Sequence, residues 1–100
     1  PPLYRAVGER IPSTVRFDND TSASCTVIDV EAEDRVGLLF SVAKTLHELQ
    51  LDVVLAKIVT EKGAAIDTFY VTGRDRKKIL ELERLREIER GVREAIALPD

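Results

Sequence analysis

The order of the periodic segments in this sequence is the feature that most limits its possible folds. Two strand patterns precede each of two helix patterns. Val15 and Phe17 alternate with polar residues, which is the period of a half-buried strand. The segment from Ser24 to Ala32 alternates in the same way, and residues 18–22 between the two segments favour turns. We therefore expect two neighbouring strands joined by a short turn.

A helix pattern follows these strands. From about Gly37 to Gln50, apolar residues recur at intervals of three and four, which predicts an amphipathic helix with one buried stripe. The residues of that stripe are Leu39, Val42, Ala43, Leu46 and Leu49.

Two further strands are predicted after this helix. The segment from Val53 to Thr60 carries β-branched residues at both parities, which predicts a strand buried on both faces. Glu61, Lys62 and Gly63 form a hairpin signal, and residues 65–72 return as a fourth strand. We expect these two strands to be antiparallel neighbours.

A second helix is expected from Lys77 to Leu98. Its remaining positions are a dense mixture of Glu and Arg, which is typical of a solvated helix face. Its apolar residues are Leu82, Leu85, Ile88, Val92 and Ile96.

The whole order predicts an α+β protein. Two amphipathic helices need one sheet face to cover, and a crossover between parallel strands leaves room for the hairpin partner between them. The expected fold is a two-layer ferredoxin-like sandwich, with a four-stranded antiparallel sheet, two helices on one face and a permuted ββαββα order. Residues 13–98 would form this domain, and residues 1–12, with two leading prolines and Pro12, would form a linker or arm.

Composition excludes several classes of function. A net charge of -3 gives no basic surface to neutralise phosphates, so we expect no nucleic acid as partner. No apolar run approaches the ~20 residues that a membrane span requires, so we expect no membrane either. Cys25 is the only cysteine and no secretory signal opens the chain, which favours a cytoplasmic location. The missing initial methionine suggests a fragment of a longer protein.

The turn DRVGLL, residues 34–39, joins the second strand to the first helix. A glycine at a helix start leaves backbone N–H groups open, and the helix dipole adds about half a positive charge there, which suits a small anion. The alternative is purely structural: Asp34 caps the helix, worth ~1 kcal/mol, and Gly37 permits close packing of helix on sheet.

The run TVIDVEAEDRVGLLFSVAKTLHELQLDVVLAKIVTEKGAAIDTFYVT resembles an ACT domain, a small regulatory amino-acid-binding module. It covers about half of the chain. The segments VRFDND, AKIVTE and DTFYVT, and the terminal helix with no strand after it, are most similar to the C-terminal ACT domains of the uridylyltransferase that modifies the nitrogen-signalling PII protein.

The resemblance implies a set of ligand-binding residues. In ACT domains the turn before the first helix contacts a free amino acid, often where two domains meet. Asp34 would take the α-ammonium group. Two positions depart from the family pattern: Val36 stands where proline is usual, and Asp52 stands where many members have asparagine, which donates as well as accepts. The expected ligand-binding residues are Asp34, Arg35, Val36, Gly37, Leu38, Leu39 and Asp52.

The expected function is that of a regulatory module, not an enzyme, with no cofactor. By its resemblance it would sense glutamine and control an attached PII uridylyltransferase/uridylyl-removing enzyme, and it would pair with a second ACT domain in cis or in a homodimer. One alternative is an ACT-like pairing module without a ligand. Another is a small ferredoxin-like enzyme or RNA binder, which is disfavoured because the chain lacks an aromatic-rich RNA-binding strand motif.

Other candidate chemistry is sparse. His47 is the only histidine, and with Cys25 it cannot supply a tetrahedral metal site. Asp18 and Asp20 lack the ligand spacing and closing glutamate of a calcium loop, so we interpret them as turn residues. We expect no metal.

Overall fold

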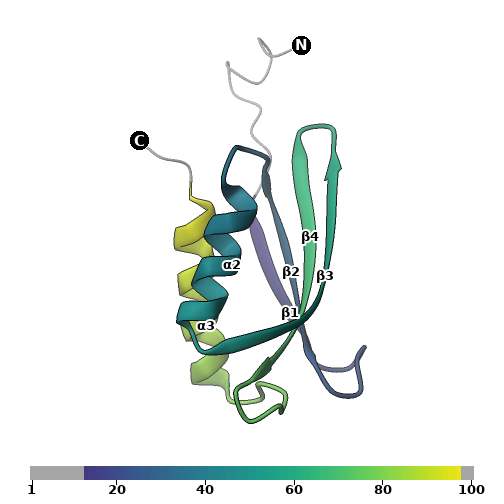
Figure 1. Cartoon of the computed structure of the whole chain (residues 1–100), viewed down its shortest axis with the longest axis vertical. Helices are drawn as coiled ribbons and strands as arrows, with labels where there is room; N and C mark the ends of the chain where they lie inside the picture. The colour runs from purple at the N-terminus through teal and green to yellow at the C-terminus, as the bar shows by residue number, and fades with distance from the viewer. Residues whose placement is uncertain (1–12, 98–100) are drawn as a thin grey trace.

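The computed structural model describes residues 13–97 of the chain (Figure 1). The expected linker at residues 1–12 and position 98 of the expected domain lie outside these residues. The elements follow the predicted ββαββα order. They are β1 (Thr14–Asp18), β2 (Thr26–Glu33), α2 (Leu38–Glu48), β3 (Leu51–Glu61), β4 (Ala64–Gly73) and α3 (Leu82–Ile96).

The four strands form one sheet in the order β1-β2-β4-β3, and every neighbouring pair is antiparallel. Figure 1 shows both helices on the same face of this sheet. The β4 strand lies between β2 and β3, as the crossover argument requires. The predicted two-layer ferredoxin-like sandwich is therefore confirmed.

The core lies between the helices and the covered face of the sheet. The alternation predicted for β2 is confirmed, since every second residue from Thr26 to Ala32 is almost fully buried. Phe69 and Val71 of β4 lie on the same face, as predicted, and are 2% and 0% exposed. The helices contribute Leu38, Val42, Leu46, Ile88, Val92 and Ile96.

Both predicted turns are present. The Asp18 carboxylate accepts hydrogen bonds from the N–H groups of Asp20 and Thr21, at 2.7 and 3.1 Å. Lys62 and Gly63 have φ of 52° and 81°, the pair of positive values that a tight two-residue hairpin turn requires. These residues act in turns, and the β3–β4 hairpin is confirmed.

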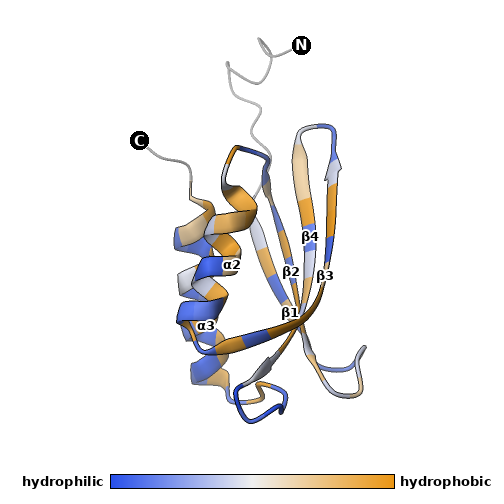
Figure 2. Ribbon diagram, in the orientation of Figure 1, coloured by the Kyte–Doolittle hydropathy of each residue, from blue (hydrophilic) through white to orange (hydrophobic). Residues whose placement is uncertain are grey.

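The prediction that the segment from Val53 to Thr60 is buried on both faces is wrong. Only Leu51 of β3 is buried, because β3 is an edge strand and its hairpin with β4 extends beyond the helices (Figure 1). Figure 2 shows hydrophobic residues along this exposed strand. The large apolar residues and their exposed fractions are Val53 43%, Val54 65%, Leu55 49%, Ile58 46% and Val59 47%.

The second helix begins at Leu82 and not at Lys77. Residues 77–80 belong to neither a helix nor a strand, and long-range hydrogen bonds hold the backbone of Ile79 among them. The Ile79 N–H donates to Thr26 Oγ1 at 2.8 Å, and its carbonyl accepts from Asn19 Nδ2 at 2.8 Å. Leu82 is 61% exposed and lies outside the buried stripe.

The stripe predicted for α2 is rotated. Leu38, Val42 and Leu46 are its buried residues, one at each turn of the helix. Leu39 is 44% exposed and Ala43 is also exposed, so the prediction was wrong for these two residues. Burial begins with the first helical residue, Leu38, and this sets the face that meets the sheet.

Candidate functional site

The predicted ligand turn, residues 34–39, leads from β2 into α2, whose first residue is Leu38. The Asp34 N–H donates to the Gly63 carbonyl at 2.9 Å, which ties this turn to the β3–β4 hairpin turn. Figure 1 shows both turns at the same end of the molecule. The Leu38 N–H donates to the Arg35 carbonyl at 3.2 Å and closes the turn before the helix.

No side chain of residues 13–97 caps the start of α2. Gly37 is the N-cap residue, and the first turn of the helix holds no acidic residue. The Ser41 N–H donates to the Gly37 carbonyl at 2.9 Å. The N–H groups of Leu39 and Phe40 precede that bond and have no acceptor within residues 13–97. The positive end of the α2 dipole is therefore open.

The structural alternative for this turn is wrong in both parts. Asp34 does not cap α2, and its exposed carboxylate makes no hydrogen bond within the described part of the chain. A Cβ atom on Gly37 would meet nothing within 4 Å, so this glycine does not serve close packing. Its φ of 82° lies in the left-handed region, so the glycine is there for its backbone conformation.

The other side chains of this turn lie in different environments. Val36 is 100% exposed, whereas Leu38 is 3% exposed and belongs to the core. Arg35 Nη2 donates to the Ala95 carbonyl at 2.8 Å, near the end of α3. Arg35 Nε is buried without a partner among the described residues. The Leu38 side chain is therefore not available to a ligand, and Arg35 is already engaged with α3.

Asp52 is the second residue of β3, which begins soon after α2 ends, so it lies at the opposite end of α2 from this turn. The helix between them has 11 residues, which corresponds to roughly 16 Å. Asp52 forms an ion pair with Arg74, which also donates to the Leu51 carbonyl at 3.3 Å. A single copy of the domain thus does not bring Asp52 to the turn at Asp34, and Arg74 balances the Asp52 charge.

Asp67, in the middle of β4, was missed by the sequence analysis. Its side chain is 3% exposed, and Oδ1 has no hydrogen-bond partner in the described chain. Burial raises the pKa of Asp67; the Val59 backbone N–H lowers it, and the negative charge of Asp34 raises it further. The two-residue period of the strand could have revealed it, since Asp67 occupies a core-facing position between Ala65 and Phe69.

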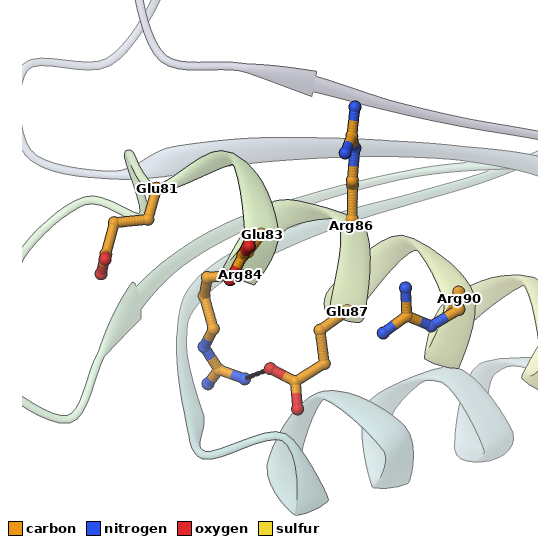
Figure 3. A pocket seen from close by; sticks show the side chains of 6 residues that line it. All are labelled: Glu81, Glu83, Arg84, Arg86, Glu87 and Arg90. Atoms are coloured by element: carbon orange, nitrogen blue, oxygen red, sulfur yellow. Dashed lines mark hydrogen bonds and ion pairs between the residues drawn. The ribbon is translucent and has the colours of Figure 1, made fainter.

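A shallow hollow on α3 is lined by charged side chains only (Figure 3). Arg84 Nη1 pairs with Glu87 Oε1 at 2.8 Å, and Figure 3 shows Arg86 directed away from the other side chains. The hollow is lined by three glutamates and three arginines, and these side chains do not point to a common position. It therefore provides no binding site for an anion or for a cation. The lining residues are Glu81, Glu83, Arg84, Arg86, Glu87 and Arg90.

Within residues 13–97, no three His, Cys, Asp or Glu side chains are grouped so that they could hold a metal ion. None of the helices in that range is both long enough and apolar enough to cross a membrane.

Comparison with known proteins identifies relatives of this chain. A bifunctional uridylyltransferase/uridylyl-removing enzyme of Azospirillum brasilense is 37% identical over 89 residues, covering 89% of this chain and 10% of the enzyme. The same-named enzyme of Novosphingobium aromaticivorans is 42% identical over 81 residues, covering 81% and 9%. The ACT domain-containing protein ACR3 of Arabidopsis thaliana is 30% identical over 90 residues, covering 89% and 20%. The chain thus spans a fifth or less of the length of each of these relatives.

No solved structure matches the chain. The family model for an "ACR9-like, ACT-like domain" matches residues 14–99, which includes every helix and strand of the sandwich. With the permuted strand order and the relatives in agreement, the chain belongs to the family of ACT-like domains.

Proposed function

We propose that this domain is a regulatory amino-acid-binding module, with glutamine as its first candidate ligand. The ligand's α-carboxylate docks on the N–H groups of Leu39 and Phe40 at the start of α2, and its α-ammonium group lies against Asp34. Asp52 of a second ACT domain lies nearby. The attached enzyme that the module controls is a PII uridylyltransferase/uridylyl-removing enzyme, in keeping with the relatives of that name.

The observation that carries this proposal is the uncapped start of α2. Two open N–H donors and the helix dipole favour a carboxylate. Asp34 supplies an exposed negative charge three residues before the N-cap residue. Together these groups complement the two charges of a free amino acid.

Regulation follows from linkage between binding and domain pairing. The exposed edge strand β3 offers unpaired backbone groups and apolar side chains to a second ACT domain, in cis or in a homodimer. A ligand that binds only the paired arrangement stabilises it by about 2.7 kcal/mol at a hundredfold excess over Kd. That energy is sufficient to shift an attached catalytic domain between two states.

Titration calorimetry of the folded chain against glutamine and the other common amino acids tests the proposal. We expect heat with glutamine and a Kd that weakens about tenfold in Leu39→Pro, which removes one N–H donor at a helix start where proline is tolerated. Glu83→Pro makes the same change at the same helical position of α3 and should leave the Kd unaltered. Thermal unfolding of both variants shows whether either loss is a loss of fold. Absence of heat with every amino acid, under conditions where the domain is paired, would contradict the sensing function.

The second candidate is an ACT-like pairing module without a ligand. It is favoured by the apolar edge of β3, which needs a partner whether or not an amino acid binds. Sedimentation with and without glutamine separates the two functions. A sensor pairs more tightly when glutamine is added, whereas a pure pairing module associates equally in both conditions.

A further inference from the structure

Arg35 connects two elements that lie far apart in the sequence. Its backbone belongs to the turn before α2, and its Nη2 atom donates to the carbonyl of Ala95 at 2.8 Å. Ala95 lies in the last turn of α3, so no N–H group of that helix can donate to its carbonyl. Figure 1 shows the start of α2 and the end of α3 at the same end of the molecule. The guanidinium group therefore supplies a donor that the last turn of α3 lacks.

This contact leaves part of the guanidinium group unsatisfied. Arg35 Nε is buried and has no hydrogen-bond partner within residues 13–97, which is costly for a buried donor. Arg35 also forms no ion pair with an aspartate or glutamate of those residues. A carboxylate carries a full negative charge and can accept two parallel hydrogen bonds from a guanidinium, whereas a carbonyl group offers one neutral oxygen. A carboxylate within reach of Arg35 therefore competes with the Ala95 carbonyl for this side chain.

The proposed ligand brings such a carboxylate to the segment that carries Arg35. The Leu38 N–H donates to the Arg35 carbonyl at 3.2 Å. Residues 35–38 thus form a hydrogen-bonded turn, in which the first and fourth Cα atoms lie within about 7 Å of each other. The proposed docking donors, the N–H groups of Leu39 and Phe40, directly follow Leu38. The long side chain of Arg35 begins at this turn and can reach a carboxylate docked there.

We propose that Arg35 changes its hydrogen-bond acceptor when the amino acid binds, from the Ala95 carbonyl to the α-carboxylate of the ligand. This inference rests on the proposed function. The Ala95 carbonyl then loses its donor, and the last turn of α3 opens more often. Because the guanidinium contacts the ligand only after it has left Ala95, binding favours the state in which this turn is released. Binding at the start of α2 thereby changes the C-terminal end of α3.

The test follows amide hydrogen exchange in the last turn of α3, at residues 94–96, with and without saturating glutamine. We expect these amides of the wild type to exchange at least about threefold faster when glutamine is bound. Arg35→Ala should exchange rapidly there without ligand, and glutamine should change its rate by less than about 1.5-fold. Its Kd for glutamine should rise about tenfold, because a charged contact to the carboxylate is lost. Arg35→Lys keeps a charged donor and should restore part of the response.

Arg84→Ala is the matched control. Arg84 also donates from its guanidinium group to a backbone carbonyl, that of Leu49, but it lies near the start of α3 and not at its end. The variant removes the same kind of contact, so glutamine should still accelerate exchange at residues 94–96 at least about threefold. Circular dichroism establishes that each variant is folded.

The outcomes separate this inference from the function on which it rests. If calorimetry detects no binding of an amino acid, the proposed function fails and the inference fails with it. If glutamine binds to the wild type but exchange at residues 94–96 is unchanged or slower, only the change of acceptor by Arg35 is overturned. A folded Arg35→Ala variant that retains the full acceleration overturns it as well. The wild-type measurement is sufficient for the test if Arg35→Ala does not fold.

Discussion

Arg35 Nη2 donates a 2.8 Å hydrogen bond to the carbonyl of Ala95, so the turn before α2 is joined to the C-terminal end of α3. The last carbonyl groups of a helix receive no hydrogen bond from an N–H group of the same helix, and they carry a partial negative charge. A guanidinium group is therefore favourable there. This bond spans 60 positions in the sequence. It connects the proposed ligand turn to the last helix of the domain.

We predict that Arg35→Ala lowers the free energy of unfolding by about 1–3 kcal/mol, because it removes a charged hydrogen bond and packed side-chain atoms. Chemical denaturation measures this change. Arg16→Ala, at an exposed position on β1, should change the free energy of unfolding by less than about 0.5 kcal/mol. Equal effects of the two variants would show that the Arg35 contact contributes no stability.

The backbone conformation of Gly37 leads to a second prediction. Since its φ is 82° and the space beside it is open, Gly37→Ala should cost about 1–2 kcal/mol through backbone strain without any clash. Asparagine tolerates this conformation better, so Gly37→Asn should cost less. Thermal unfolding of the three proteins should rank glycine above asparagine and asparagine above alanine. A neutral Gly37→Ala variant would contradict the role assigned to this glycine.

Local patterns predicted the parts of the fold that depend on neighbouring residues. The alternation of β2, the turn at Asp18 and the hairpin at Gly63 were all predicted, because each follows from residues a few positions apart. The start of α3 was not, since the backbone N–H of Ile79 donates to Thr26, which lies 53 positions away. A stretch rich in valine and isoleucine indicates a strand, but it does not show whether that strand is central or at an edge.

The candidate site, too, was predicted from the sequence only where its features depend on neighbouring residues. The glycine turn at the start of α2 was visible in the sequence, which left open whether Asp34 caps the helix. The engagement of Arg35 by Ala95 depends on how the two helices pack. The burial of Asp67 depends on the position of β4 inside the sheet. Side chains whose surroundings are set by sheet order could therefore not be assigned from local pattern alone.

The exposed face of β3 leads to a third prediction. If β3 is the pairing surface, the double variant Leu55→Lys and Val59→Lys should raise the dissociation constant of the paired domain at least tenfold. It places like charges near each other across the interface and removes apolar contact area. The folded monomer should retain its melting temperature, because both side chains are about half exposed. Sedimentation equilibrium and thermal unfolding measure the two effects.

Phe40→Lys is the comparison for this variant, since Phe40 on α2 is 70% exposed and lies beside the turn at Asp34. It introduces lysine on the other apolar surface at which a second domain could dock. We expect it to leave association unchanged. If Phe40→Lys dissociates the pair and the β3 variant does not, the pairing surface is the start of α2.

The buried carboxyl of Asp67 makes stability depend on pH in a defined direction. Its folded-state pKa is raised above the ordinary value of 3.8, so the folded protein binds more protons than the unfolded chain between those two pKa values. The free energy of unfolding therefore falls as pH rises from below 3.8 through the folded-state pKa, and it stays lowered above that. Asp67→Asn removes this dependence because its amide does not ionise.

We predict that Asp67→Asn has a higher free energy of unfolding than the wild type at pH 7, and that the difference vanishes near pH 3, where the wild-type carboxyl is protonated in both states. Denaturant unfolding across this range measures the difference. Asp29→Asn, at an exposed aspartate of β2, controls for the loss of one negative charge. If the difference in free energy of unfolding does not change with pH, ionisation of Asp67 does not destabilise the folded protein.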